Sequence, residues 1–284
     1  MGTEFRILFY TDDSTLAALA ARHAFERIAA LDSMMSDYRE DSEISLLAKT
    51  AGQAKTFVPV SDDLRKVLNF AQEVSKRTGG AFDVTAGSLT KLWRRAFRQK
   101  EMPSSEEIAA SLKTVGYRDL TVNKNKTVQL KKPGMMLDLG GIAKGYAVDE
   151  AMSVLQSHGI LIALVDGGGD LRAAEAPPGT IGWLIEKPVM TSEGLGTKKT
   201  TIRNAAVATS GATYKFLEHE GKRYSHIIDP RTGKGVTERH LVTVTAPTCM
   251  EADAWATALS VEVGTDVVLW LNKKGVQVEF TIEH

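Results

Sequence analysis

The second half of the chain is a succession of short strand-like segments, and this constrains the fold more than any other feature of the sequence. From Gly179 onward these segments follow one another through short turns: "GWLIEK", "TTIRNAAVAT", "KRYSHIID" and "HLVTVTAP". Neighbouring strands joined in this way pair antiparallel, since a parallel pair needs a long crossover connection. Together with the helices of the first half, the pattern predicts an α+β fold and argues against a doubly wound parallel sheet.

Helical patterns dominate the first half. Residues 12–36 carry apolar side chains at near-helical spacing behind candidate caps at 12–14, and a second helix is predicted from Ser61 to the glycine pair at Gly79. The polar segment "TSEGLGTKK" (191–199) is predicted as an exposed loop. The remaining predictions are a helix in "SSEEIAASLKTV", strands in "EFRILFY", "DLTVN", "TVQLKK" and "ILIALVD", helices ending at His158 and starting near Met250, and a helix–strand unit ending at "VQVEF".

Bulk composition excludes several classes of protein. The 284 residues are 43% hydrophobic, which is enough to bury the core of one large domain or of two closely joined lobes. The 35 basic residues balance the 35 acidic ones without long runs of either sign, so we expect no nucleic-acid partner. The single cysteine, Cys249, cannot form an internal disulfide, and no Cys/His cluster has the spacing of zinc ligands.

A glycine-rich turn precedes one of the predicted helices. The stretch "LDLGGIAKGYAVDEA" places Gly140, Gly141, Lys144 and Gly145 at the mouth of that helix. Glycines let the backbone approach a ligand closely, and a helix N-terminus with a nearby lysine attracts an anion such as phosphate. The spacing matches neither the dinucleotide-binding nor the P-loop pattern, so tight corners without a ligand explain these glycines equally well.

Two oxygen-bearing side chains share one face of the helix in "CMEADAWATALSVE". Asp253 and Thr257 are four residues apart, which places them about one turn apart on that face. Oxygen ligands with few carboxylates suit Mg²⁺, which keeps several waters and is often bound through substrate phosphates. Alternatively, Asp253 complements the helix dipole and Thr257 packs in a half-buried position, and the helix pattern by itself favours this simpler interpretation.

His226 lies in "RYSHIIDPRTG", at the end of a predicted strand and next to a turn. Strand alternation predicts that Tyr224, His226 and Ile228 share one face, while Asp229 begins the turn. A neutral imidazole in such an accessible place can take a proton from a hydroxyl near pH 7. An isolated histidine of this kind is more often a surface or hydrogen-bonded residue without a catalytic role.

The segment "GGAFDVTAGSLTKLW" (79–93) combines two glycines, an acid and aromatic residues before the apolar start of a helix. Its backbone can approach a flat ligand, and Phe82 or Trp93 can contact an aromatic ring of that ligand. Both side chains can equally belong to the hydrophobic core.

Seven segments, taken together and in order, resemble one known family. They are "MSDYREDSEIS", "GAFDVTAGSLTKLW", "LDLGGIAKGYAVDEA", "ALVDGGGDL", "ATSG", "YSHIIDPRTG" and "TAPTCMEADAWATAL". This set is similar to the FAD:protein FMN transferases of the ApbE family over nearly the whole chain. The resemblance implies a bilobal α+β fold, here one domain over residues 1–284 with two closely joined lobes.

The resemblance also implies a reaction. Enzymes of this family are Mg²⁺-dependent, split FAD, attach the FMN part to a threonine of a target flavoprotein through a phosphoester bond, and release AMP. It implies Asp253 and Thr257 as side-chain ligands of the metal, with main-chain carbonyls of Gly141 and Ala256 as further ligands. His226 is expected to take the proton from the attacking threonine.

Further positions are expected to bind FAD by the same resemblance. Lys144 would border the pyrophosphate, and Asp138 would bind the adenosine or ribityl portion. The other positions expected to line the FAD site are Met35, Tyr38, Ala81, Phe82, Asp83 and Ile227.

Two rival functions share the same pocket. One is a Mg²⁺-dependent FAD pyrophosphatase, in which water replaces the threonine and free FMN appears; the other is a non-catalytic flavin-binding carrier. Because many family members are exported bacterial lipoproteins, the expected acceptor is a flavoprotein subunit of a membrane redox complex. The expected location is the periplasm, with a lipid anchor in the precursor; a cytoplasmic location is the alternative, because this chain shows neither a signal pattern nor a lipobox cysteine.

Overall fold

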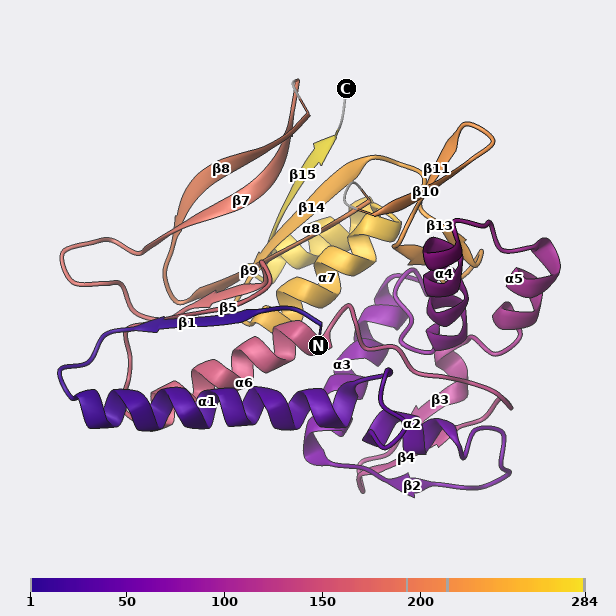
Figure 1. Cartoon of the computed structure of the whole chain (residues 1–284), viewed down its shortest axis with the longest axis horizontal. Coiled ribbons are helices and arrows are strands. Elements are labelled where there is room, and N and C mark those ends of the chain that lie inside the picture. The colour runs from indigo at the N-terminus through magenta and orange to yellow at the C-terminus, as the bar shows by residue number, and fades with distance from the viewer. Residues whose placement is uncertain (1, 193, 213–214, 283–284) are drawn as a thin grey trace.

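The computed structural model describes residues 2–192, 194–212 and 215–282. A six-stranded sheet, entirely antiparallel among these residues, forms its centre (Figure 1). This confirms both the antiparallel pairing and the α+β fold. The strands of this sheet are, in spatial order, β1 (Phe5–Phe9), β5 (Ala163–Gly167), β6 (Leu171–Ala173), β9 (Ala205–Gly211), β14 (His240–Ala246) and β15 (Gln277–Ile282).

Smaller sheets surround the central one. A three-stranded sheet lies beside the helices of the first half, and three two-stranded hairpins extend from the second half (Figure 1). The three-stranded sheet contains β2 (Val58–Pro59), β4 (Thr127–Leu130) and β3 (Leu120–Val122). The hairpins are β7 (Trp183–Thr191) with β8 (Gly194–Ile202), β10 (Phe216–His219) with β11 (Lys222–Ser225), and β12 (Ile228–Asp229) with β13 (Lys234–Gly235).

Several helices start at a capping side chain that the sequence shows. Asp13, Ser61 and Ser104 accept hydrogen bonds from backbone N–H groups of the first turns of α1, α3 and α5, which confirms these predicted helices. The helices are α1 (Ser14–Met35), α2 (Glu43–Ala48), α3 (Asp62–Arg77), α4 (Gly87–Gln99), α5 (Ser105–Leu112), α6 (Ala143–Ser157), α7 (Cys249–Val261) and α8 (Thr265–Lys273), with a 3₁₀ turn η1 (Tyr117–Asp119). None of the helices in the described part of the chain is long and apolar enough to cross a membrane.

Three predictions in the second half were wrong. Residues 191–199 were expected to form a loop, but most of them belong to the long β7–β8 hairpin, where pairing with β7 outweighs the loop-forming glycines. The segment "TTIRNAAVAT" is divided between β8 and β9 by a turn at Asn204, which has a φ of 48°. The segment "KRYSHIID" is likewise two strands, because the chain changes partners at His226, whose N–H donates to the carbonyl of Lys215.

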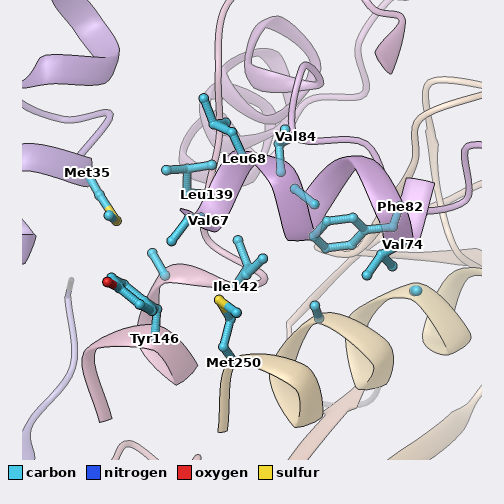
Figure 2. Packing of buried hydrophobic residues seen from close by; sticks show 14 of the residues in the cluster. Met35, Val67, Leu68, Val74, Phe82, Val84, Leu139, Ile142, Tyr146 and Met250 are labelled. Carbon is cyan, nitrogen blue, oxygen red and sulfur yellow. The ribbon is translucent and has the colours of Figure 1, made fainter. Parts of the chain in front are cut away.

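One large hydrophobic core joins the two halves of the molecule. It contains side chains from α1, α3, α6 and α7 (Figure 2), together with side chains from the central and three-stranded sheets. Met35, Phe82 and Tyr146 are all buried in it. The two-lobed single domain over residues 1–284 stays a prediction, but this shared core shows that the halves bury apolar surface against each other.

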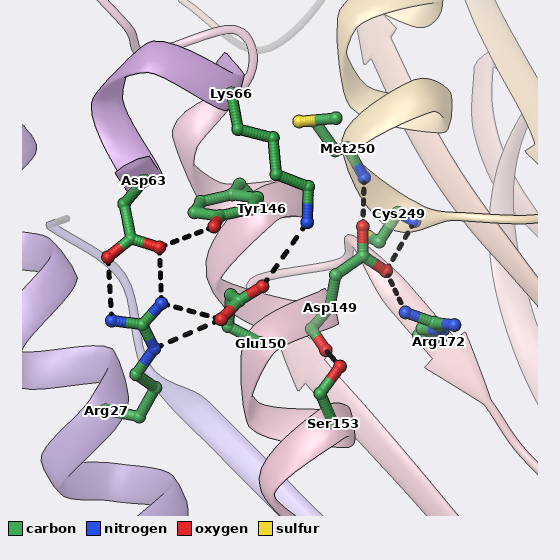
Figure 3. Close-up of polar contacts among 10 residues, drawn as sticks. All are labelled: Arg27, Asp63, Lys66, Tyr146, Asp149, Glu150, Ser153, Arg172, Cys249 and Met250. Carbon is green, nitrogen blue, oxygen red and sulfur yellow. Dashed lines mark hydrogen bonds and ion pairs between the residues drawn. The ribbon is translucent and has the colours of Figure 1, made fainter. Parts of the chain in front are cut away.

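A polar cluster ties α1, α3 and α6 together beside this core. Arg27 of α1 donates to Asp63 at 2.5 Å and to Glu150 at 2.6 Å, and the hydroxyl of Tyr146 donates to Asp63 at 2.6 Å (Figure 3). Lys66 lies 3.5 Å from Glu150. Desolvation, and next the hydrogen bond to Asp63, raise the pKa of Tyr146. The hydroxyl of Tyr146 therefore stays protonated and donates a hydrogen bond that attaches α6 to α3.

Candidate functional site

A cavity of about 650 Å³ lies where α4, α6, α7, the end of β9 and the turn at His226 meet. Its volume is within the range of roughly 300–1,000 Å³ that is usual for cofactor sites. Twelve of the thirteen site residues predicted from the sequence line it, although they come from segments far apart in the chain. They are Tyr38, Ala81, Phe82, Asp83, Asp138, Gly141, Lys144, His226, Ile227, Asp253, Ala256 and Thr257.

Met35 is the exception. It is the last residue of α1, is only 4% exposed, and packs in the large core (Figure 2). Met35 is not one of the described residues that line the cavity. Tyr38, three residues later, is 75% exposed and does line the cavity. The helix end thus separates a core residue from a cavity residue that the sequence motif placed together.

The floor of the cavity is a group of three charges: the buried carboxylates of Asp170 and Asp253 and the partly buried ammonium of Lys144. The ammonium of Lys144 lies 2.5 Å from Asp170 and 3.4 Å from Asp253. Burial works to lower the pKa of Lys144, but the two carboxylates outweigh it and raise that pKa, so the lysine stays charged. Burial and then the charge of Asp253 raise the pKa of Asp170. Lys144, which the sequence analysis considered as a positive charge near an anion, is therefore already paired with two acids.

Helices α6 and α7 fix this floor by capping each other. Asp149 of α6 accepts hydrogen bonds from the N–H groups of Cys249 and Met250, both at 2.9 Å, at the start of α7 (Figure 3). In return, Asp253 of α7 accepts from the N–H of Gly145, at 3.1 Å, in the first turn of α6. These N–H groups have no partner within their own helices, so each carboxylate satisfies donors that burial would otherwise leave unpaired.

The glycines of the motif have different tasks. A Cβ on Gly145 would lie 2.3 Å from the carbonyl oxygen of Cys249, so this glycine is needed for the close packing of α6 on α7. A Cβ on Gly141 would lie 2.8 Å from the Thr257 side chain, inside the cavity. Gly145 therefore forms a packing contact that needs no ligand, whereas Gly141 borders the cavity and its contact with a ligand stays a prediction.

The floor offers oxygen donors that fit Mg²⁺. Apart from the long contact of 3.5 Å to Lys144, no hydrogen bond engages Oδ1 of Asp253 among the described residues. The Thr257 hydroxyl lies beside Gly141, 3.0 Å from the place that a Cβ on this glycine would take, and both residues line the same cavity as Asp253. Within the described residues no group of three or more His, Cys, Asp and Glu side chains could hold a metal. A hard cation that takes few protein ligands and completes its shell with substrate oxygens suits such a donor set.

His226 lies at the opening of the cavity. It is exposed, and its Nδ1 is 3.3 Å from the carbonyl oxygen of Lys215. Because a carbonyl only accepts, this contact places the ring proton on Nδ1 and leaves Nε2 free to accept a proton. The protein around the ring removes water from it and lowers the pKa of His226, which keeps the imidazole neutral at pH 7.

Two acids predicted to bind the ligand also organise the walls. Asp83 accepts from the N–H and hydroxyl of Thr85 and from the N–H of Tyr117, and burial raises its pKa. Asp138 accepts from the N–H of Gly140 at 2.7 Å and from Arg94 at 2.9 Å. Both carboxylates therefore hold turns in place before any ligand binds.

Helix α4 supplies one wall of the cavity, and the motif analysis missed most of it. Five of its side chains line the cavity at spacings of three and four residues, which is one face of a helix. This face contains Thr90, Trp93, Arg94, Phe97 and Arg98. Trp93, which was left open as core or ligand contact, is 1% exposed and donates to the carbonyl of Gly233 at 2.8 Å, so it belongs to the core while one edge meets the cavity. The mixed polar and aromatic character of one helix face was the available signal.

Comparisons with known proteins identify the family of this chain. The model of the ApbE family matches residues 1–280. The FAD:protein FMN transferase of Haemophilus influenzae is 35% identical over 96% of this chain and 82% of its own length, and that of Escherichia coli is 33% identical over 92% and 76%. The structure of the flavin transferase ApbE from Vibrio cholerae covers 100% of this chain and 91% of its own, at 29% identity and a TM-score of 0.86. This chain therefore belongs to the ApbE family.

Proposed function

We propose that this protein transfers FMN from FAD to a threonine hydroxyl of an acceptor flavoprotein and releases AMP. The observation that carries the proposal is the meeting, in one cavity, of the charged Lys144–Asp170–Asp253 floor with a neutral histidine at the opening. The names of the Haemophilus influenzae and Escherichia coli relatives support the same reaction. The cavity is large enough for a dinucleotide to enter with its pyrophosphate toward the floor.

In the proposed reaction, His226 accepts a proton and Lys144 stabilises negative charge. Nε2 of His226 accepts the proton of the threonine hydroxyl as its oxygen attacks the phosphorus on the FMN side of the pyrophosphate. A phosphorus–oxygen bond to threonine forms, the bond to the bridging oxygen breaks, and AMP leaves with that oxygen. Lys144 stays protonated between its two carboxylates and balances negative charge that develops on the leaving phosphate.

Asp253, Thr257 and the main-chain carbonyls of Gly141 and Ala256 would hold Mg²⁺ together with phosphate oxygens of FAD. An ion held there would supply Lewis-acid stabilisation of negative charge on the pyrophosphate. Lys144 is nearer to Asp170, at 2.5 Å, than to Asp253, at 3.4 Å, so the charge of Asp253 would be available to such an ion.

The decisive experiment incubates the protein with FAD and Mg²⁺ under three conditions. The first has no acceptor, the second contains a flavoprotein subunit of a membrane redox complex, and the third contains the same subunit with its target threonine replaced by alanine. Transfer predicts AMP release and a flavinylated subunit by intact mass, only with the threonine form. AMP with free FMN in all three conditions would show the pyrophosphatase instead. FAD binding without AMP under any condition would show a carrier.

The acceptor and the compartment are part of the proposal. We infer an acceptor in a membrane redox complex and a periplasmic location with a lipid-anchored precursor, from the family resemblance. Cell fractionation of the native protein tests the location: recovery with periplasmic or membrane material supports it, and recovery in the cytoplasm contradicts it.

A further inference from the structure

We propose that Arg94 is a positioning residue that presets the opening of the cavity for FAD, an inference that rests on the proposed function. Arg94 projects from the cavity-facing side of α4. Its guanidinium contacts three side chains at once: Asp37 and Tyr38, in the turn after α1, and Asp138, in the loop before α6. It thereby joins α4 to two segments that lie 57 and 44 residues away in the sequence.

The geometry explains why an arginine is needed. One terminal nitrogen donates to Asp37, and the other donates to Asp138 at 2.9 Å. The guanidinium carbon also lies over the Tyr38 ring, 4.5 Å from the ring centroid. A planar cation with several donors can make all three contacts together, whereas the ammonium of lysine is a compact point charge.

Tyr38 and Asp138 are both held by the Arg94 side chain. Tyr38 is 75% exposed, so the ring surface that Arg94 does not cover remains open to the cavity. Asp138 is held on its other side by the N–H of Gly140, in the glycine loop. Without Arg94, Asp37 and Asp138 would face each other as uncompensated partly buried acids, and the Tyr38 turn would lose its attachment to the loop.

This arrangement predicts a loss of FAD affinity with little loss of the chemical step. Arg94 is bound to Asp37 and Asp138 and does not belong to the charged floor. We expect Arg94→Met to weaken FAD binding by roughly 5- to 30-fold, the effect of losing one or two charge-assisted contacts, and to change kcat by less than about threefold. KM should rise with Kd.

A double-mutant cycle tests the indirect action. FAD affinity, followed by flavin fluorescence without acceptor, is measured for wild type, Arg94→Met, Tyr38→Leu and the double variant. If Arg94 acts through Tyr38, the double variant binds FAD no more than about twofold more weakly than Arg94→Met. Losses that multiply would overturn the inference, as would a kcat that falls as much as kcat/KM.

Controls separate this inference from stability and from the proposed function. Arg95→Met changes the next residue of α4, whose partner is the exposed Glu107, and should leave FAD affinity unchanged. If Arg94→Met does not fold, Arg94→Lys keeps a charge for one carboxylate, and wild-type affinity in that variant would overturn the inference. A wild-type protein that binds no FAD would contradict the proposed function; unchanged binding in a folded Arg94 variant contradicts only the role of Arg94.

Discussion

The floor and the opening of the cavity are built on different principles. In the floor, Lys144 and Asp253 are held by two helices that cap each other's first turns, and Asp170, in the turn between β5 and β6, pairs with Lys144. At the opening, Tyr38 and His226 are exposed side chains on turns, positioned by one or two contacts each. Buried charges persist only when they are paired and hydrogen-bonded, so the floor must be rigid, whereas the opening can admit a large ligand and an acceptor protein.

Because of this difference, substitutions in the floor and at the opening should affect stability and activity differently. A change in the floor alters stability and chemistry together, because its side chains serve both. A change at the opening alters binding or rate with little effect on the fold. The following predictions, from the largest effect to the smallest, test this separation.

Asp253→Asn in the floor should reduce FMN transfer below detection at ordinary Mg²⁺ concentrations. It removes the one formal negative charge that the proposed metal ligands supply, while the remaining amide oxygen can still accept from Gly145. We expect a stability loss of about 1–3 kcal/mol, because a buried charged contact is weakened. AMP release across a Mg²⁺ titration, together with thermal melting, measures both effects.

Asp266→Asn, in the first turn of α8 and exposed, is the matched control and should change neither property. An active Asp253→Asn enzyme with the wild-type Mg²⁺ dependence would remove Asp253 from the metal site.

His226→Ala at the opening should slow transfer by roughly 10²–10⁴-fold, as expected for a lost general base, and leave FAD affinity and melting temperature unchanged. Single-turnover formation of flavinylated acceptor measures the rate. His219→Ala, an exposed histidine in β10 with no place among the cavity-lining residues described, should transfer normally. A wild-type rate in His226→Ala would exclude this residue from the chemistry.

Gly145→Ala in the floor should destabilise the fold by about 1–3 kcal/mol, because the added methyl would overlap the carbonyl of Cys249 and push α6 from α7. We expect a lower melting temperature together with reduced transfer, since Asp253 moves with α7. Ser153→Ala, on the exposed side of the same helix, is the control. Normal melting with normal activity would show that the close helix contact is not required.

The pH dependence of the transfer rate should reflect the titration of His226 at the opening and not that of the charged residues in the floor. Because the pKa of His226 is lowered, its neutral form persists to more acidic pH than that of a free histidine. The rate at saturating FAD should therefore be flat around pH 7 and fall by up to about tenfold per pH unit only below the lowered pKa. A fall that begins above pH 6.5, or an unchanged profile in His226→Ala, would contradict this assignment.

Local patterns were sufficient for much of the fold. Caps such as Asp13, Ser61 and Ser104 bond to backbone within three residues, so the helix starts they mark are visible in the sequence. The strand boundaries were less predictable. Residues 191–199 and the break at His226 depend on which distant strand pairs with each segment, and periodicity along one segment carries no information about its partner.

The sequence by itself determined the α+β class and the main helices. Its ordered motifs also pointed to twelve residues that line one cavity in the structure. Only the tertiary structure decided that Lys144 has partners 26 and 109 residues away, that Gly145 serves a helix contact, and that Arg94 connects Tyr38 with Asp138. The reason is physical: capping and amphipathic spacing act within a few residues, whereas the pairing of buried charges depends on which surfaces the whole fold brings into contact.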